Sequence, residues 1–229
     1  MPAMEPLKPE ELAAVRAIST PTICNAIETF NIGSRNEGFM DSTITCRFPE
    51  IGPVVGYAVT AKIRAAEPPC IELSHSKVWA EFERVPKPWL VVIEDFDYPN
   101  PVGSFWGEVN ASMYKALGAV GTITNGGVRD LPEVRATGFQ VFSSSVLVFH
   151  AYVHIVEYGG TAVVGGLTVR RADLLHGDEH GVISIPHEIA RDVPQAAQVI
   201  VAAERGLIDY ARSPACTPEG LAEMYGKVD

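Results

Sequence analysis

This 229-residue sequence lacks several features that would assign it to a class at once. No apolar run approaches the roughly 18 residues of a membrane-spanning helix. The first residues lack the basic-then-apolar pattern of a signal peptide, so we expect a cytoplasmic protein without membrane partners. Basic residues are few: 18 lysines and arginines stand against 28 acidic residues, and a net charge of −10 disfavours nucleic-acid binding. A small anionic substrate is compatible with this charge, because a local site can be positive on an acidic protein.

Cysteine is scarce and scattered, with four residues at positions 24, 46, 70 and 216. No two of them have the Cys-x-x-Cys spacing of zinc or redox pairs, so we expect buried, reduced thiols. The composition, 47% hydrophobic and 20% charged, is typical of a folded globular protein.

Apolar periodicity predicts helices and strands that alternate through the middle of the chain. A helix over residues 22–29 is expected to start with Thr20 as its cap and Pro21 in its first turn. In the helix over 106–117, Val109, Met113 and Leu117 share the apolar side. The other expected helices cover residues 10–18, 71–85, 131–136 and 188–206, with a partly helical tail from 208; the expected strands cover 51–63, 89–94, 120–124, 139–142, 161–164, 167–169 and 181–186. With no internal repeat, this order predicts one α/β domain with mixed sheets over residues 1–229, with short helical extensions at both ends.

The most informative segment follows the strand 120–124. Asn125, Gly126 and Gly127 predict a sharp turn with positive φ angles, after which Arg129 and Asp130 stand side by side. Such a pair is ordinarily a surface ion pair or a helix-capping acid. The functional alternative is an aspartate that binds a divalent metal beside an arginine that stabilises an oxyanion.

A second candidate is the helix entrance around Gly103 and Gly107, which Glu108 follows. Glycine at a helix start allows several free backbone N–H groups to point at one anion. The alternative is that Glu108 only complements the helix dipole.

Histidines and further acids give weaker signals. His150 and His154 could share a metal only if their segment were helical, and its β-rich composition favours packed or hydrogen-bonded histidines. Asp173 and Asp178 flank a predicted strand, where turn capping is the ordinary role.

Taken together, Gly107-Glu108 and the segment Asn125 to Asp130, with twenty residues between Glu108 and Arg129, resemble the RraA-like family. This family includes 4-hydroxy-4-methyl-2-oxoglutarate and 4-carboxy-4-hydroxy-2-oxoadipate aldolases and regulators of RNase E. The resemblance extends over most of the chain, through residues 22–27, 52–60, 165–169 and 178–182. Glu108 and Asn25 stand where aspartate is common in the family, and residues 68–87 differ from its compact form.

The resemblance implies a three-layer β/β/α swivelling domain that assembles into homotrimers or homohexamers, with active sites at subunit interfaces. It also implies a lyase that uses Mg²⁺ or Mn²⁺ and releases pyruvate from a 4-hydroxy-2-oxo acid, with decarboxylation of oxaloacetate as a side activity. The alternative that it leaves open is a non-catalytic, protein-binding regulator of the RNase E type. The substrate, the metal and the choice between trimer and hexamer stay open.

The resemblance also implies roles for individual residues. Asp130 would hold the metal, Arg129 would stabilise the enolate, and Glu108 would move a proton. Backbone N–H groups of Trp106, Gly107, Glu108 and Val109 would bind the substrate carboxylate. The nearby aromatic residues Phe105, Trp106 and Tyr98 could shape a pocket or pack in an interface. Glu204, on the long helix, is either an ordinary exposed residue or one that reaches a neighbouring subunit's site.

Overall fold

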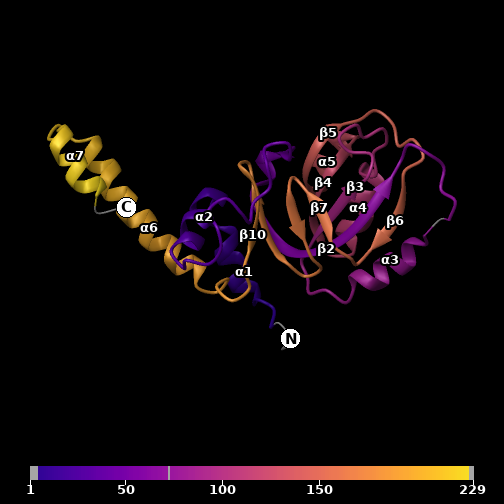
Figure 1. Cartoon of the computed structure of the whole chain (residues 1–229), viewed down its shortest axis with the longest axis horizontal. Helices are drawn as coiled ribbons and strands as arrows, with labels where there is room; N and C mark the ends of the chain where they lie inside the picture. Colours follow the sequence, from indigo (N-terminus) through magenta and orange to yellow (C-terminus); the bar gives the residue numbers. More distant parts are fainter. Residues whose placement is uncertain (1–4, 72, 227–229) are drawn as a thin grey trace.

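The fold is a mixed sheet covered by helices on one face and by a small β-hairpin on the other (Figure 1). The structure is a computed structural model that describes residues 5–71 and 73–226. The strands are β1 (Thr45–Cys46), β2 (Val54–Arg64), β3 (Trp89–Asp95), β4 (Ala119–Val128), β5 (Gln140–Val146), β6 (His154–Tyr158), β7 (Ala162–Val164), β8 (Leu167–Val169), β9 (Leu174–Asp178) and β10 (Gly181–Ile185). The helices are α1 (Pro9–Arg16), α2 (Thr20–Glu28), α3 (His75–Phe82), α4 (Glu108–Ala116), α5 (Leu131–Thr137), α6 (Val193–Ala211) and α7 (Pro218–Tyr225), with a 3-10 turn at Pro49–Ile51.

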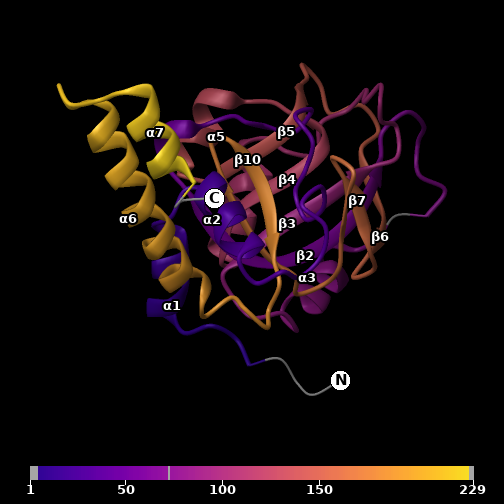
Figure 2. The ribbon, with the colours of Figure 1, turned by 60° about the vertical axis from the view of Figure 1, so that its left-hand side comes forward.

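The sheet has the order β1-β5-β4-β3-β2-β9-β10, and β6 pairs with β2. Strands β2, β3, β4 and β5 run parallel, whereas β1, β6, β9 and β10 pair antiparallel with their neighbours. Because parallel strands end at the same edge, the residues that follow β3, β4 and β5 lie close together there (Figure 2).

Side chains alternate between the two faces of the sheet, as the pleat requires. Trp89, Val91 and Ile93 of β3 join the larger apolar cluster, which the helices cover. Leu90 and Val92 join a smaller cluster beneath the hairpin β7–β8. The layers are therefore hairpin, sheet and helices, which confirms the predicted three-layer β/β/α architecture with mixed strands.

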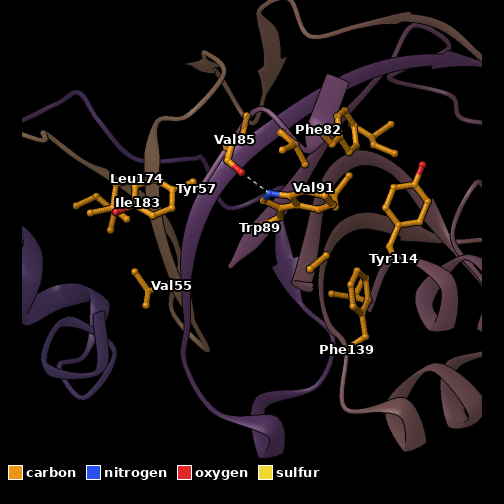
Figure 3. Packing of buried hydrophobic residues seen from close by; sticks show 14 of the residues in the cluster. Val55, Tyr57, Phe82, Val85, Trp89, Val91, Tyr114, Phe139, Leu174 and Ile183 are labelled. Carbon is orange, nitrogen blue, oxygen red and sulfur yellow. Dashed lines mark hydrogen bonds between the residues drawn. The ribbon is translucent and has the colours of Figure 1, made fainter. Parts of the chain in front are cut away.

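The larger cluster centres on aromatic side chains from different elements (Figure 3). The ring of Trp89 packs edge-on against Phe82, and its Nε1–H donates to the carbonyl of Val85 at 3.0 Å. A buried indole N–H with a partner avoids the cost of an unpaired donor, so α3 and the turn after it are fixed to β3.

Most predicted elements are confirmed, and three details are corrected. Ser19, not Thr20, caps α2, and its hydroxyl accepts the Thr22 N–H. Helix α4 begins at Glu108 rather than at 106, and its buried side carries Ala111 and Tyr114, while Val109 is 70% exposed. The long helix starts at Val193, where Pro194 occupies its first turn.

The four cysteines are free, but the expectation that they are buried holds only for Cys46. Cys24 and Cys216 are half-buried, and Cys70 is exposed. Among the helices that the structure describes, none combines the length and the hydrophobicity needed to cross a membrane.

Candidate functional site

The charge pair lies where β4 ends and α5 begins. Arg129 Nε stands 3.6 Å from Asp130 Oδ2, and the two side chains are 34% and 39% exposed. Asp130 occupies the N-cap position of α5 with φ 54°, a left-handed conformation that few residues other than glycine adopt. Aspartate and asparagine tolerate this conformation better than most residues, so an acid is suited to the position.

The predicted turn at Asn125, Gly126 and Gly127 is wrong. These residues continue β4 with a register shift against β5, and neither glycine has a positive φ angle. The glycines are needed for close packing: a Cβ on Gly126 would lie 2.7 Å from Asp95 Oδ2, and one on Gly127 would lie 2.4 Å from the Leu147 side chain. The sharp change of direction occurs instead at Asp130.

The helix entrance and the charge pair meet because the loop before α4 joins the end of β4. Trp106 forms an isolated parallel bridge with Val128, and its carbonyl accepts the Arg129 N–H at 3.0 Å. The Ser104 hydroxyl contacts the carbonyls of both Trp106 and Gly127, at 2.6 and 2.9 Å. Gly107 and Asp130, 23 positions apart in sequence, are therefore neighbours in space.

The carboxylate of Asp130 rests against the first residues of α4. A Cβ on Gly107 would lie 2.5 Å from Asp130 Oδ2, so only glycine admits the carboxylate at this distance. The same oxygen accepts the Glu108 N–H at 3.3 Å. Among the described residues, no hydrogen bond engages Asp130 Oδ1 or the N–H groups of Gly107 and Val109. An open carboxylate oxygen, a guanidinium and two free helix donors thus converge at one place.

Ser104 and Asn110 are supporting residues that sequence reasoning missed. Ser104 is buried, and Asn110 Nδ2 donates to the Phe105 carbonyl at 2.5 Å, which fixes the segment leading into α4. Serine and asparagine beside a helix start are common caps, so their types alone do not indicate that Ser104 holds the loop to β4 or that Asn110 fixes the segment before α4.

Two of the three aromatic residues near the loop meet neither expectation, because Phe105 and Trp106 pack in the chain's own core, whereas Tyr98 lines a cavity. Phe105 and Trp106 are buried, with edge-on contacts to Tyr114, and Trp106 also packs against Phe139. Tyr98 is 41% exposed and lines a separate cavity of about 270 Å³ with Asp95 and Asn125.

The other candidates have structural roles. Nδ1–H of His150 and of His154 donates to a nearby carbonyl, and their segment is not helical. Asp173 accepts the Arg170 N–H in a turn, and Asp178 accepts the Thr20 N–H at 2.8 Å, which ties α2 to the sheet. Within residues 5–71 and 73–226, no group of three His, Cys, Asp or Glu side chains could hold a metal ion.

Asp95 is a buried acid at the end of β3, in the separate cavity that Tyr98 also lines. Burial raises its pKa to about 6, opposed by the Asp97 N–H that Oδ1 accepts and reinforced by the Asp97 carboxylate. Oδ2 has no hydrogen-bond partner among the described residues. Since the folded protein keeps this proton between the usual pKa of 3.8 and about 6, the free energy of unfolding should fall as pH rises through that window.

We expect Asp95 to contribute a loss of about 1–3 kcal/mol in unfolding free energy between pH 4 and pH 6.5. The Asp95→Asn variant should lack this contribution, as measured by urea unfolding at several pH values. Buried His176, whose pKa is lowered to about 4, titrates with the opposite sign, so the informative quantity is the difference between wild type and variant. Identical pH profiles for the two proteins would contradict the raised pKa.

Comparisons with known proteins agree with this architecture. A family model described as RraA-like, Aldolase/RraA, matches residues 20–184. The chain is 25% identical over 174 residues to a putative 4-hydroxy-4-methyl-2-oxoglutarate aldolase of Halalkalibacterium halodurans, covering 75% of this chain and 79% of that protein. It is 23% identical over 113 residues to protein DlpA of Legionella pneumophila, covering 48% of this chain but only 18% of DlpA.

A solved structure shares the fold. Streptomyces coelicolor RraAS2, described as an unusual member of the RNase ES inhibitor RraA protein family, superposes with a TM-score of 0.68. The match covers 87% of this chain and 97% of that one, at 21% identity.

Proposed function

Because the chain belongs to the RraA-like family, we propose that it is a divalent-metal-dependent lyase that cleaves a 4-hydroxy-2-oxo acid and releases pyruvate. The family includes aldolases and non-catalytic regulators. One observation supports the lyase: the Asp130 carboxylate lies beside Arg129 and against the start of α4, where the N–H groups of Gly107 and Val109 are free.

The donor set at Asp130 fits Mg²⁺ or Mn²⁺. Mg²⁺ is commonly held by one or two carboxylates with water completing the shell, and Asp130 supplies one carboxylate on a side chain that is 39% exposed. A structural zinc site would need about four protein ligands, which the described residues around Asp130 do not supply. When bound there, the cation would act as a Lewis acid on the 2-oxo group.

The chain's own groups account for substrate binding and charge stabilisation. The substrate carboxylate accepts the N–H groups at the start of α4, where the helix dipole adds to the attraction. Among the predicted donors, the N–H groups of Gly107 and Val109 are free at this helix start, whereas the Glu108 N–H donates to Asp130 and Trp106 is paired with Val128. Arg129 stabilises the oxygen that becomes negative when the C3–C4 bond breaks.

Glu108 is the proposed proton carrier. Its side chain is exposed in the first turn of α4, beside Asp130, and no ion pair engages it among the described residues. It accepts the proton of the 4-hydroxyl as the C3–C4 bond breaks and returns a proton to C3 of the pyruvate enolate, directly or through water. Decarboxylation of oxaloacetate forms the same enolate, and is therefore the expected side activity.

The surface beside the site supports a homo-oligomer, a trimer or hexamer, in which a neighbouring subunit covers the site. Val109, Val146, Val148 and Phe149 are between 49% and 98% exposed. Val146 pairs with Val128 in the sheet, and the Phe149 carbonyl accepts the Ser104 N–H, so these residues adjoin the charge pair. Several exposed apolar side chains next to one another are typical of a protein interface.

A protein-binding regulator is the second candidate function. The net charge of −10 supports docking to a basic RNA-binding region. The metal-binding aspartate separates the two candidates, because the family resemblance implies that regulators lack it and this chain has Asp130.

A coupled pyruvate assay with Mg²⁺, run over several 4-hydroxy-2-oxo acids and oxaloacetate, tests the proposal. We expect pyruvate from at least one hydroxy acid and slower release from oxaloacetate. Turnover of none of these compounds, together with specific capture of RNase E, would reverse the order of the two candidates.

A further inference from the structure

The proposed reaction needs two parts of the site to act on one molecule, and these parts belong to different segments of the chain. The N–H groups of Gly107 and Val109 lie at the start of α4. The charge pair Arg129–Asp130 lies between β4 and α5. A substrate held by its carboxylate at the first part presents its 2-oxo group correctly to the second only when the spacing between them is fixed. A misplacement of about 1 Å can lower a rate about 100-fold.

The side chain of Ser104 joins the two segments. Its hydroxyl lies 2.6 Å from the carbonyl oxygen of Trp106 and 2.9 Å from that of Gly127. Trp106 directly precedes Gly107, and Gly127 stands two residues before Arg129. Ser104 is 2% exposed, so these bonds lie in a low-dielectric environment where a hydrogen bond is stronger than in water. One buried hydroxyl therefore contacts both parts of the site.

The main chain that carries this hydroxyl is fixed by segments outside the site. The Ser104 N–H donates to the Phe149 carbonyl at 2.9 Å. A Cβ on the preceding residue, Gly103, would lie 2.4 Å from the carbonyl oxygen of His150 and 2.6 Å from the Cβ of Ala65. Such close approach requires glycine, and it holds the backbone at this point. The position of the hydroxyl is thus set independently of α4.

The hydroxyl also orients a peptide group that takes part in binding. The Trp106 carbonyl accepts the Ser104 hydroxyl and, at 3.0 Å, the Arg129 N–H. This carbonyl and the Gly107 N–H belong to the same planar peptide unit. Two donors that fix the direction of the carbonyl therefore also fix the direction of the N–H, which is one of the donors proposed for the substrate carboxylate.

We propose that Ser104 is a positioning residue whose hydroxyl sets the Gly107 N–H at a fixed orientation relative to Arg129 and Asp130. The inference rests on the proposed function, because it concerns the same site, and it assigns Ser104 no contact with the substrate. Without the hydroxyl, the start of α4 and the Asp130 carboxylate each keep their own binding groups. What is lost is their alignment on two groups of a single molecule.

Ser144 of β5 offers a matched control. Its hydroxyl lies 2.6 Å from the Asn125 carbonyl oxygen and 3.0 Å from that of Gly126. Ser144 thus makes the same kind of paired contact with β4 as Ser104 makes with its two carbonyls, but both of its partners are in that one strand. Ser104→Ala and Ser144→Ala should each lower the midpoint of urea unfolding. We expect only Ser104→Ala to misalign the site.

The binding of pyruvate with and without Mg²⁺, measured by isothermal titration calorimetry, tests this alignment. In the wild type, Mg²⁺ should raise the affinity for pyruvate about 5- to 150-fold, the usual range for two coupled ligands. Ser104→Ala should reduce this factor to below about threefold, while Mg²⁺ alone and pyruvate alone bind as they do to the wild type. Its kcat for pyruvate release should fall about 10- to 100-fold. Ser144→Ala should keep the wild-type coupling and kcat.

Far-UV circular dichroism establishes that each variant is folded, and Ser104→Cys, with a thiol that is only a weak donor, replaces Ser104→Ala if the latter does not fold. The inference is overturned if the Ser104 variant keeps the wild-type coupling factor, if Ser144→Ala loses it to the same extent, or if the wild type shows no coupling. Coupling in the wild type without turnover of any 2-oxo acid would contradict the lyase, and the comparison of Ser104 with Ser144 would still decide this inference.

Discussion

Replacing Asp130 by asparagine is expected to lower kcat for pyruvate release by about 10²- to 10³-fold and to remove the response to added metal. A metal that polarises a carbonyl contributes several kcal/mol to the stabilisation of the transition state, and each 1.36 kcal/mol changes the rate tenfold. Asparagine tolerates the left-handed φ of 54° at this position, so the backbone that aims the side chain is preserved. The change therefore removes the charge with little strain.

EDTA on the wild-type protein is the companion measurement. We expect chelation to abolish pyruvate release, and Mg²⁺ or Mn²⁺ to restore it in the wild type but not in the Asp130→Asn variant. Glu133→Gln is the matched control, because it removes one negative charge from the first turn of α5, three residues away, and should leave kcat unchanged. Full activity of Asp130→Asn, or of the wild type in EDTA, would refute the metal-dependent mechanism.

The sequence predicts a helix or strand correctly where its local residue pattern matches its surroundings in the folded chain. In the strand predicted at 89–94, the residues from Trp89 to Ile93 are apolar on both faces because β3 lies in the middle of the sheet between helices and hairpin. The strands 161–164 and 167–169 are signalled by Gly165 and Gly166, which have positive φ angles in the turn between β7 and β8. In both cases the local pattern and the tertiary environment agree.

The turn predicted at residues 125–127 is wrong because glycine can have two different roles. A glycine can supply a positive φ angle or remove a Cβ where another chain segment comes close, and the sequence does not distinguish the two. Gly126 and Gly127 serve the second purpose, against Asp95 and Leu147, and the strand continues through them. The positive φ angle is that of Asp130, and an aspartate at this position does not by itself predict such a conformation.

The proximity of Gly107 to Asp130 could not be derived from local patterns. It depends on the bridge between Trp106 and Val128 and on the Ser104 hydroxyl, which are contacts between distant segments. Predicting the helix from 106 placed Val109 on the buried side, whereas its exposure adds an apolar side chain to the surface beside the site. The family resemblance supplied the pairing of Glu108 with Arg129 and Asp130, and the structure explains how the fold brings the two segments together.

Arg129→Ala is expected to lower kcat by about 10²- to 10³-fold, as the loss of one preorganised oxyanion donor does in other enzymes. KM should change less, because the carboxylate of the substrate is held by the helix start rather than by this side chain. Arg129→Lys keeps the charge but loses the planar fork, and it should recover only part of the rate. Arg135→Ala is the matched control: this arginine lies one turn into α5, is 55% exposed and pairs with Glu50.

The division between kcat and KM distinguishes stabilisation of the enolate from simple binding. An interaction made only in the transition state lowers kcat and kcat/KM together, whereas one made equally in the ground state raises KM alone. If Arg129→Ala raises KM and leaves kcat intact, Arg129 is a substrate anchor, and the enolate charge must be stabilised by other groups at the start of α4. The Asp130→Asn result would keep its meaning in that case, because the two side chains have separate proposed tasks.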